Sequence, residues 1–375
     1  MSVLAPAPDF VFGNTRLRAR KSALLTAAAY EALLGRPVEG VQEALAETAY
    51  RPELEATLAR GAGKRALELA IRDHLGRALA EMRTFYRDRA RELVDVILAR
   101  FDLQNLLTLL RGQVRHRPAE VVLASIVPLG PLGDGTAEEV ARRDEPAAAI
   151  ELLAAWRLPD PATAAALTRA WPRFERTQDL AHLEHELVRA HAEGVERELA
   201  RAPDALRELI ARERDATNTL TVLRLRTALQ VDELTALPPA PESGRFLPGG
   251  RIGESALDEA LHMPARPDAV ARLAAAARRA DWQALLGRYA SADDVDASDL
   301  LLLQRELEAA RVRWALRLFL TGDPLGIDIP VAYTVAKENE ARNLRLVAEG
   351  ADRDEPAETV GPRLLLPEED GRWAA

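Results

Sequence analysis

One helical phrase carries side chains whose types and spacing could bind a metal ion. In DLAHLEHELVRAH, the residues Asp179, His182, His185 and Glu186 follow one another at spacings of three, three and one, which places imidazole and carboxylate groups on neighbouring helix turns. The phrase is not the H-E-x-x-H motif of zinc enzymes, because position 189 is an arginine. We therefore interpret the histidines as surface residues of a polar helix face and predict no metal site. A metal-dependent helical enzyme that uses His182, His185 and Glu186 is kept as a rival hypothesis.

Other signatures of catalysis are absent from the sequence. RGAGKR at 60–65 has a glycine before Lys64, but it lacks the spacing and the Ser or Thr of a phosphate-binding loop. There is no G-x-S-x-G motif, and no G-x-G-x-x-G motif follows a strand. The chain has no cysteine, which excludes disulfides, thiolate metal sites and a Cys nucleophile. We predict a mechanical or binding protein that has no catalytic residues and no cofactor.

A pair of polar residues recurs inside apolar helical sequence. DLQNLLTLLR at 102–111 and DATNTLTVLR at 215–224 share six of ten letters in register, and in both an acid precedes an asparagine by three positions. KENEARNLRLVAEG contains the same spacing, although its Thr and terminal Arg are absent. The three pairs are Asp102 with Asn105, Asp215 with Asn218, and Glu340 with Asn343.

A second landmark recurs at a nearly constant distance from the first. Glu68, Glu184 and Glu306 lie in similar helical phrases and precede the acids of the three pairs by 34, 31 and 34 residues. Two landmarks at a nearly fixed offset predict a three-fold internal repeat. The period is far longer than that of the common solenoids, so each repeat should be a small helical bundle with its own partial core.

Helix geometry indicates where the polar pairs lie. Residues three apart share a face, and Asp102 and Asn105 lie on the side of Leu106 and Leu109. We expect at least partial burial, which costs about 1–3 kcal/mol for an unpaired group, so a neighbouring helix should supply partners. Arg111 and Arg224 lie on the opposite faces of their helices, so a neutralising arginine should come from elsewhere. Two interpretations stay open: a structural polar clamp between helices, or a ring of polar groups lining a central opening.

Composition favours helices over sheets. The chain has 375 residues with 50 basic and 59 acidic side chains, and only 5% of its residues are aromatic. A core rich in Leu and Ala is typical of packed helices. The net charge of −9 with scattered arginines argues against nucleic-acid binding. The sequence has no signal-peptide pattern and no run of 18 apolar residues, so we expect at most a peripheral membrane role.

Apolar periodicity and Pro/Gly clusters outline the domains. Amphipathic periods predict helices over 16–34, 65–84, 90–111, 177–200, 204–230, 256–288 and 298–320. Only VVLASIV at 121–127 resembles a strand, and its helical flanks argue against one. The main loops are expected at 127–135, 237–250 and 321–330. We predict an all-α fold made of helical repeats at 10–126, 127–236 and 237–349, followed by a Pro/acid-rich tail at 350–375. The tail should be mobile or loosely docked.

Three segments resemble a known family. NTRLRARKSALLTAAAYEALLGRPVEGVQEALAETAY at 14–50, TQDLAHLE at 177–184 and DPLGIDIPVAYTVAKENEARNLR at 323–345 are similar to the C subunit of bacterial and archaeal V/A-type rotary ATPases, the counterpart of the eukaryotic d subunit. The resemblance covers residues 14 to 349. The loop at 237–250 and the tail after Asp352 are longer than the family pattern.

The resemblance implies a funnel of three similar helical domains around a pseudo-three-fold axis, with the polar pairs near its inner wall. It implies a non-catalytic central-stalk subunit whose partners are the central-shaft subunits and the membrane rotor (proteolipid) ring. Such a subunit would lie peripherally on the cytoplasmic face of the plasma membrane and link ATP synthesis or hydrolysis to proton or sodium transport. The alternative is a helical scaffold or adaptor protein outside a rotary machine.

Overall fold

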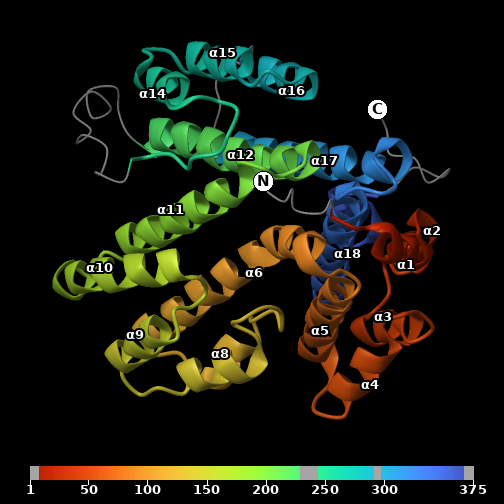
Figure 1. Cartoon of the computed structure of the whole chain (residues 1–375). Coiled ribbons are helices and arrows are strands. Elements are labelled where there is room, and N and C mark those ends of the chain that lie inside the picture. Colours follow the sequence, from red (N-terminus) through yellow and green to blue (C-terminus); the bar gives the residue numbers. More distant parts are fainter. Residues whose placement is uncertain (1–7, 229–243, 291–296, 367–375) are drawn as a thin grey trace, which may run out of the picture. The chain divides into compact units, whose positions relative to one another are not determined.

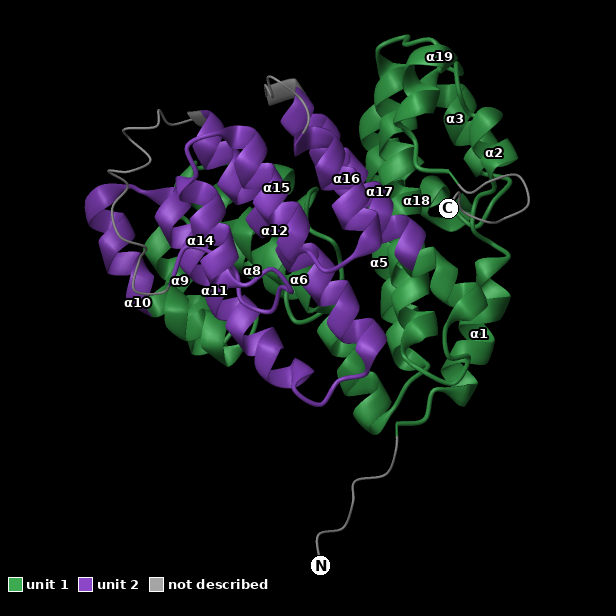
Figure 2. Ribbon diagram, turned by 90° about the horizontal axis from the view of Figure 1, so that it is seen from above, with its two compact units in different colours: residues 1–168, 315–375 green, residues 169–314 purple. Residues whose placement is uncertain are grey.

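The computed structural model describes residues 8–228, 244–290 and 297–366. Helices, turns and loops make up these residues and no strand occurs among them, which confirms the all-α class. The chain divides into two compact units, residues 1–168 with 315–375, and residues 169–314 (Figure 2). Within the described ranges, no helix combines the length and the apolar character that crossing a membrane requires.

The first unit is formed by the two ends of the chain. Its helices are α1 (Val11–Lys21), α2 (Ala27–Glu31), α3 (Val38–Leu45), α4 (Arg51–Leu58), α5 (Gly63–Thr84), α6 (Asp88–Val114), α7 (Ala119–Leu123), α8 (Asp134–Ala141), α9 (Pro146–Ala155), α18 (Asp328–Asp352), α19 (Ala357–Val360) and the 3-10 helix η1 (Gly361–Arg363), in the order drawn in Figure 1. The helix α18 is buried along most of its circumference, as expected of the central helix of a bundle.

Polar contacts join the N-terminal helix to the C-terminal part of the first unit. The Asn14 side chain donates to the carbonyls of Pro324, at 2.9 Å, and Gly326, at 2.8 Å. Its oxygen accepts from the Tyr86 hydroxyl at 2.8 Å. Asn14 is buried, so these three bonds satisfy an amide that would otherwise cost stability. Residues more than 300 positions apart therefore fold as one body.

The second unit contains α11 (Leu180–Leu199), α12 (Asp204–Ala228), α14 (Glu254–His262), α15 (Arg266–Ala276) and α16 (Ala280–Ala290). Two further helices, α10 (Pro161–Thr177) and α17 (Ala297–Thr321), cross the boundary between the units. The core of the second unit packs aliphatic residues such as Val222, Leu257 and Leu273 around the fully buried Trp282. Its few aromatic residues fit the Leu- and Ala-rich composition.

Several predicted element boundaries are wrong. The range 16–34 is split into α1 and α2, and 256–288 is split into α14, α15 and α16. Pro264 and the left-handed Arg278, with φ of 51°, stand at the two later breaks. Of these breaks, only the one at Pro264 is marked by a helix-breaking residue in the sequence. The segment 121–127 is the end of α7 and a turn, which agrees with the expectation that its helical flanks argue against a strand.

The predicted tail, from residue 350 onward, is packed against α18 as far as residue 366. The helix α18 continues to Asp352, and Val360 is buried against Gly350. Leu365 is hydrogen-bonded to α18, so the prediction of a loose tail is wrong up to residue 366. Residues 367–375, and residues 237–243 of the long predicted loop, lie outside the described residues.

Candidate functional site

All six residues of the three polar pairs are buried. Each pair lies on a long helix: α6 carries Asp102 and Asn105, α12 carries Asp215 and Asn218, and α18 carries Glu340 and Asn343. Their exposed fractions are between 0% and 8%. Such residues require hydrogen-bond partners, and these partners reveal what the repeat does.

Each asparagine makes the same two-bond contact, which we call an asparagine clamp. The side-chain NH₂ donates to a backbone carbonyl, and the side-chain oxygen accepts from the backbone N–H of that same residue. The clamped residues are Val127 for Asn105 (2.8 and 3.0 Å), Leu247 for Asn218 (2.9 and 2.8 Å) and Leu365 for Asn343 (2.8 and 3.1 Å). The clamp fixes an apolar residue of a loop to the long helix three times in one chain.

In the first two copies the acid of the pair binds the same loop, at the residue five positions after the clamped one. Asp102 accepts from the backbone N–H of Leu132 at 3.1 Å, and Asp215 accepts from that of Ile252 at 2.9 Å. A Cβ at Gly130 or Gly250 would lie within 3.0 Å of the carboxylate, so both positions require glycine.

The two clamped loops therefore align letter by letter. VPLGPLG at 127–133 and LPGGRIG at 247–253 share one proline and two glycines in register.

A third contact repeats eight residues after the asparagine. The Gln113 side chain donates to the carbonyls of Val140, at 2.9 Å, and Ala141, at 3.2 Å. The Arg226 side chain donates to those of Ala260, at 3.2 Å, and Leu261, at 2.7 Å. These carbonyls lie in the last turns of α8 and α14, where the regular intrahelical hydrogen bonds end. Each of these two copies thus fixes the loop and the end of the helix that follows it.

The third copy replaces the loop with other segments of the first unit. Glu340 accepts from the backbone N–H of Leu25 at 2.7 Å and from the Tyr50 hydroxyl at 2.8 Å. Asn339 joins Asn343 in donating to the carbonyl of Leu365, both at 2.8 Å. The C-terminal segment takes the place that an internal loop takes in the other two copies.

The three buried acids differ in how their charge is balanced. Asp215 pairs with Arg279 at 2.5 Å, and Glu340 pairs with Lys337 one turn earlier on α18. Among the described residues, no Lys or Arg nitrogen lies within 4 Å of the Asp102 carboxylate. Burial therefore raises the pKa of Asp102 to about 7, and the Leu132 N–H and the more distant Arg83 offset this only in part.

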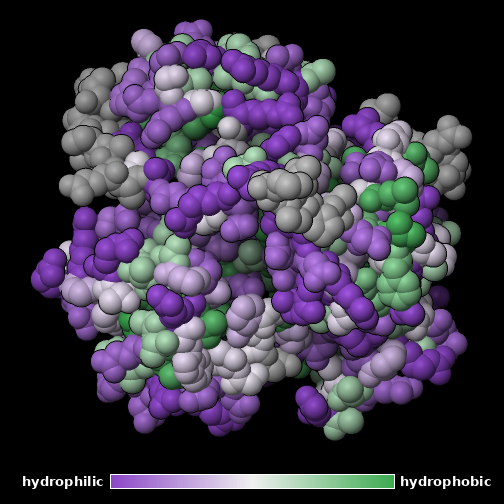
Figure 3. All heavy atoms as spheres, viewed as in Figure 1, coloured by the Kyte–Doolittle hydropathy of each residue, from purple (hydrophilic) through white to green (hydrophobic). Residues whose placement is uncertain are grey.

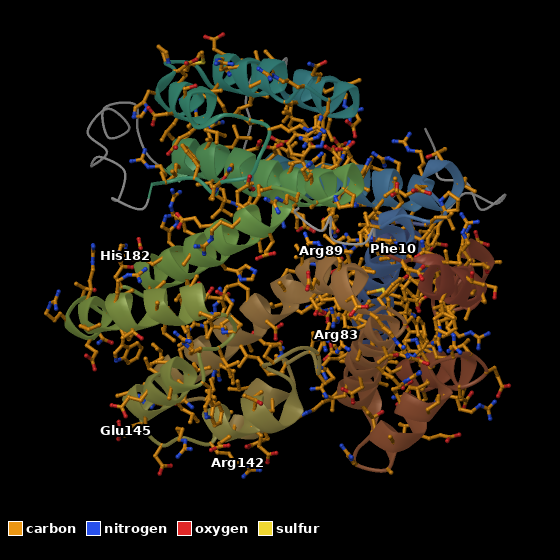
Figure 4. The ribbon with its side chains drawn as sticks, in the orientation of Figure 1. Phe10, Arg83, Arg89, Arg142, Glu145 and His182 are labelled. Atoms are coloured by element: carbon orange, nitrogen blue, oxygen red, sulfur yellow. The ribbon has the colours of Figure 1, made fainter. Side chains whose placement is uncertain are left out.

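Two predictions about these partners are corrected. The partners of the pairs are mainly loop backbone groups and not a neighbouring helix, because a loop offers an N–H and a C=O with no helical partner. A neutralising arginine from elsewhere in the chain is confirmed for Asp215 and is wrong for Asp102. Arg83 lies at the end of α5 (Figure 4) and bonds instead to Asp95.

A buried polar chain continues behind Glu340. Lys337 Nζ lies 3.0 Å from His74 Nε2, His74 Nδ1 lies 3.0 Å from a Glu53 oxygen, and the Tyr50 ring stacks on the imidazole at 3.8 Å. Burial and the nearby Lys337 lower the pKa of His74 to about 4. An ammonium group can only donate, so Nε2 accepts from Lys337 and the neutral ring donates from Nδ1 to Glu53.

Each of the three landmark acids lies on the helix that comes just before a helix carrying a polar pair. Glu68 on α5, Glu184 on α11 and Glu306 on α17 are partly exposed. Glu68 lies 3.8 Å from Lys64, and Glu306 accepts from Arg288 at 2.9 Å. The structure therefore places Glu68 and Glu306 in ion pairs on partly exposed helix faces.

The histidine phrase on α11 has contacts of its own. Asp179 accepts from the backbone N–H of His182 at 3.0 Å and so caps the start of α11, where His182 lies (Figure 4). His185 Nε2 donates to the Gly244 carbonyl at 2.9 Å. Within the part of the chain that the structure describes, no group of three or more His, Asp or Glu residues could hold a metal ion.

Comparison with known proteins gives consistent matches. Residues 13–361 match the family described as ATP synthase (C/AC39) subunit. The chain is 29% identical over 372 residues to the C subunit of the V-type ATP synthase of Thermus thermophilus, covering 96% of this chain and 100% of that one. It is 26% identical over 355 residues to the C subunit of the V-type ATP synthase of Deinococcus radiodurans, covering 94% and 90%. It is 24% identical over 363 residues to the C subunit of the A-type ATP synthase of Haloferax volcanii, covering 96% and 97%.

Proposed function

Because the chain belongs to the family of ATP synthase (C/AC39) subunits, we propose that it is the non-catalytic central-stalk subunit of a V/A-type ATPase or ATP synthase. It acts as a socket that couples the rotating central shaft to the membrane rotor ring. It thereby links ATP synthesis or hydrolysis to the transport of protons or sodium ions. The observation that carries the proposal is the family match over residues 13–361, which spans both compact units and contains all three polar pairs.

The clamps suit a part that transmits torque. Such a part must hold its partners without deforming, and close-packed interiors transmit strain. Asparagine clamps tie loops to α6 and α12 through buried bonds, and Gln113 and Arg226 hold the ends of the helices that follow. Bonds of this kind resist sliding of a loop along a helix, since slipping by one residue would leave buried polar groups unpaired.

The repeated clamp also supports a three-fold design. We propose that repeats at 10–126, 127–236 and 237–349 form the three domains of a funnel, with the docked C-terminal segment completing the third clamp. That the polar pairs line a central opening stays a prediction. Their bonds to loop backbone indicate that they act on the funnel by holding its loops in place.

In this proposal the protein's partners are the shaft subunits and the proteolipid ring, and it lies on the cytoplasmic face of the membrane. Purification of the tagged full chain from gently solubilised membranes, with every co-purifying band identified, tests this. The expected result is recovery of the shaft and ring subunits together. A preparation that reproducibly contains neither would favour a helical scaffold outside a rotary machine.

A further inference from the structure

The helix α1 exposes an apolar stripe flanked by arginines. Gly13, Asn14 and Leu17 are buried on one side. At 100° per residue the opposite side presents Val11, Phe12, Thr15 and Ala19, all exposed, with Arg16 and Arg18 at its two edges. Val11 is 53% exposed and Phe12 is 60% exposed. An amphipathic helix whose apolar side faces outward requires an explanation, because a helix that only served the core would bury that side.

A second exposed apolar segment lies beside this helix. Leu320, at the end of α17, is 62% exposed, and Leu325, in the loop before α18, is 58% exposed. The bonds of Asn14 to Pro324 and Gly326 fix this loop against α1, and Lys21 Nζ lies 5.0 Å from the centre of the Phe319 ring. In Figure 3 hydrophobic side chains gather on the face over α1 and its neighbours. We call α1 together with residues 317–325 the α1 face.

The α1 face is basic, although the whole chain has a net charge of −9. Its exposed cations are Arg16, Arg18, Lys21 and Arg317. The exposed acids on or next to it are Asp9 and Asp323, which accept from the backbone N–H groups of Val11 and Leu325 at 2.9 Å. Four cations against two acids leave the α1 face positive, so its charge complements an anionic partner.

Apolar and basic groups together fit one kind of partner best. The interface of an anionic bilayer accepts aromatic and aliphatic side chains at the level of the acyl chains and attracts Lys and Arg to the headgroups. An acidic protein segment would pair with the arginines but would leave Phe12 and Leu320 in water.

We propose that the α1 face binds the anionic lipid headgroups of a membrane directly. This goes beyond the proposed function, because it requires neither the shaft nor the ring. Arg16 and Arg18 supply the electrostatic attraction, while Val11, Phe12, Leu320 and Leu325 insert among the headgroups. Such a contact would let the protein rest against lipid in addition to its protein partners.

Sedimentation of the purified full chain with vesicles tests the proposal. The chain should bind vesicles of phosphatidylglycerol mixed with phosphatidylcholine and should not bind vesicles of phosphatidylcholine alone, and added salt should weaken the binding. Each basic residue near an anionic surface contributes about 1 kcal/mol, so the double variant Arg16→Gln/Arg18→Gln should bind about thirty-fold more weakly. Phe12→Ser should weaken binding about ten-fold.

The matched control removes an exposed apolar pair elsewhere. Leu301 is 68% exposed and Leu302 is 47% exposed, and both lie on α17 within the second unit. The variant Leu301→Ser/Leu302→Ser should bind vesicles like the unchanged chain. Equal binding by all variants, equal binding to neutral vesicles, or binding to polyglutamate without binding to vesicles would overturn the proposal. The proposed function is tested separately by co-purification. If the Arg16→Gln/Arg18→Gln variant still co-purifies with the shaft and ring subunits, the proposed function stands whether or not the chain binds lipid.

Discussion

Asp102 and Asp215 occupy equivalent positions in two copies of the clamp, and replacing each with asparagine is expected to change stability in opposite directions. Asp102 accepts a hydrogen bond from the Leu132 N–H and has no cation within 4 Å among the described residues. Asp215 is fully buried and bonds to the N–H groups of Arg251 and Ile252 and to the Arg279 guanidinium. At Asp102 the substitution therefore removes a negative charge that no cation balances. At Asp215 it leaves the buried Arg279 without one of its carboxylate partners.

The size of the first effect follows from the pKa of Asp102. In the folded chain the carboxyl keeps its proton up to about pH 7, whereas its ordinary pKa is 3.8. The folded state binds more protons than the unfolded state within this window, so the free energy of unfolding falls as pH rises through it. One pKa unit corresponds to 1.36 kcal/mol, so the free energy of unfolding decreases by roughly 4 kcal/mol as pH rises through the whole window. About 3 kcal/mol of this decrease takes place above about pH 5.

Asp102→Asn should lack this pH dependence while keeping an oxygen for the Leu132 N–H. We compare the free energy of unfolding of this variant with that of the unchanged chain. The difference between them should shift in favour of the variant by about 3 kcal/mol between about pH 5 and about pH 8. His74 titrates in both proteins alike, so the difference isolates Asp102. Asp215→Asn leaves the buried Arg279 with Glu208 as its remaining carboxylate partner, and it should destabilise by about 2–4 kcal/mol at both pH values.

Urea unfolding of the full chain at the two pH values, followed by circular dichroism, provides the measurement. The reasoning would be refuted if Asp102→Asn and the unchanged chain lost the same stability over this pH range. It would also be refuted if Asp215→Asn were as stable as the unchanged chain.

The remaining predictions concern the clamps and the buried polar chain. Gly130→Ala places a Cβ within 3.0 Å of the Asp102 carboxylate at a residue with φ of 73°, and thermal unfolding should report a loss of about 2–4 kcal/mol. Lys337→Met leaves the Glu340 carboxylate buried without its cation, and urea unfolding should report a loss of about 3–5 kcal/mol. The His74 imidazole, with a pKa of about 4, should stay neutral from about pH 5 to pH 8 when followed by NMR.

Matched variants control the first two of these predictions. Gly61→Ala should be nearly neutral, because a Cβ there meets nothing within 4 Å. Lys64→Met removes a partly exposed lysine that pairs with Glu68, Glu349 and Asp352, all of them partly exposed, and it should cost about 1 kcal/mol, less than Lys337→Met. A control variant as destabilised as its test variant would contradict the role assigned to burial.

The sequence predicts the helices and the repeated polar pairs because both depend on local spacing. The leucines of α6 and α12 recur every three or four residues, and residues three apart on a helix share a face whatever packs against them. The burial of Asp102 and Asn105 was therefore foreseeable from Leu106 and Leu109. The break between α14 and α15 could have been predicted from Pro264, but the breaks after α1 and at Arg278 are marked by no Pro or Gly in the sequence.

The partners of the pairs could not be predicted in the same way because they lie far along the chain. Arg279 is 64 residues from Asp215, and Leu365 reaches Asn343 only because the tail folds back onto α18. The clamped loops did leave a signal that the prediction missed. VPLGPLG and LPGGRIG align in register, but their distances from the asparagines differ by seven residues, 22 against 29, which obscures the repeat.

The most direct test of the central claim is to compare ion movement with ATP hydrolysis in membranes whose complex lacks this chain. We expect that the catalytic head still hydrolyses ATP while ATP-driven ion transport is lost, and that adding back the purified chain restores transport. Normal ATP-driven transport without the chain would contradict the coupling role.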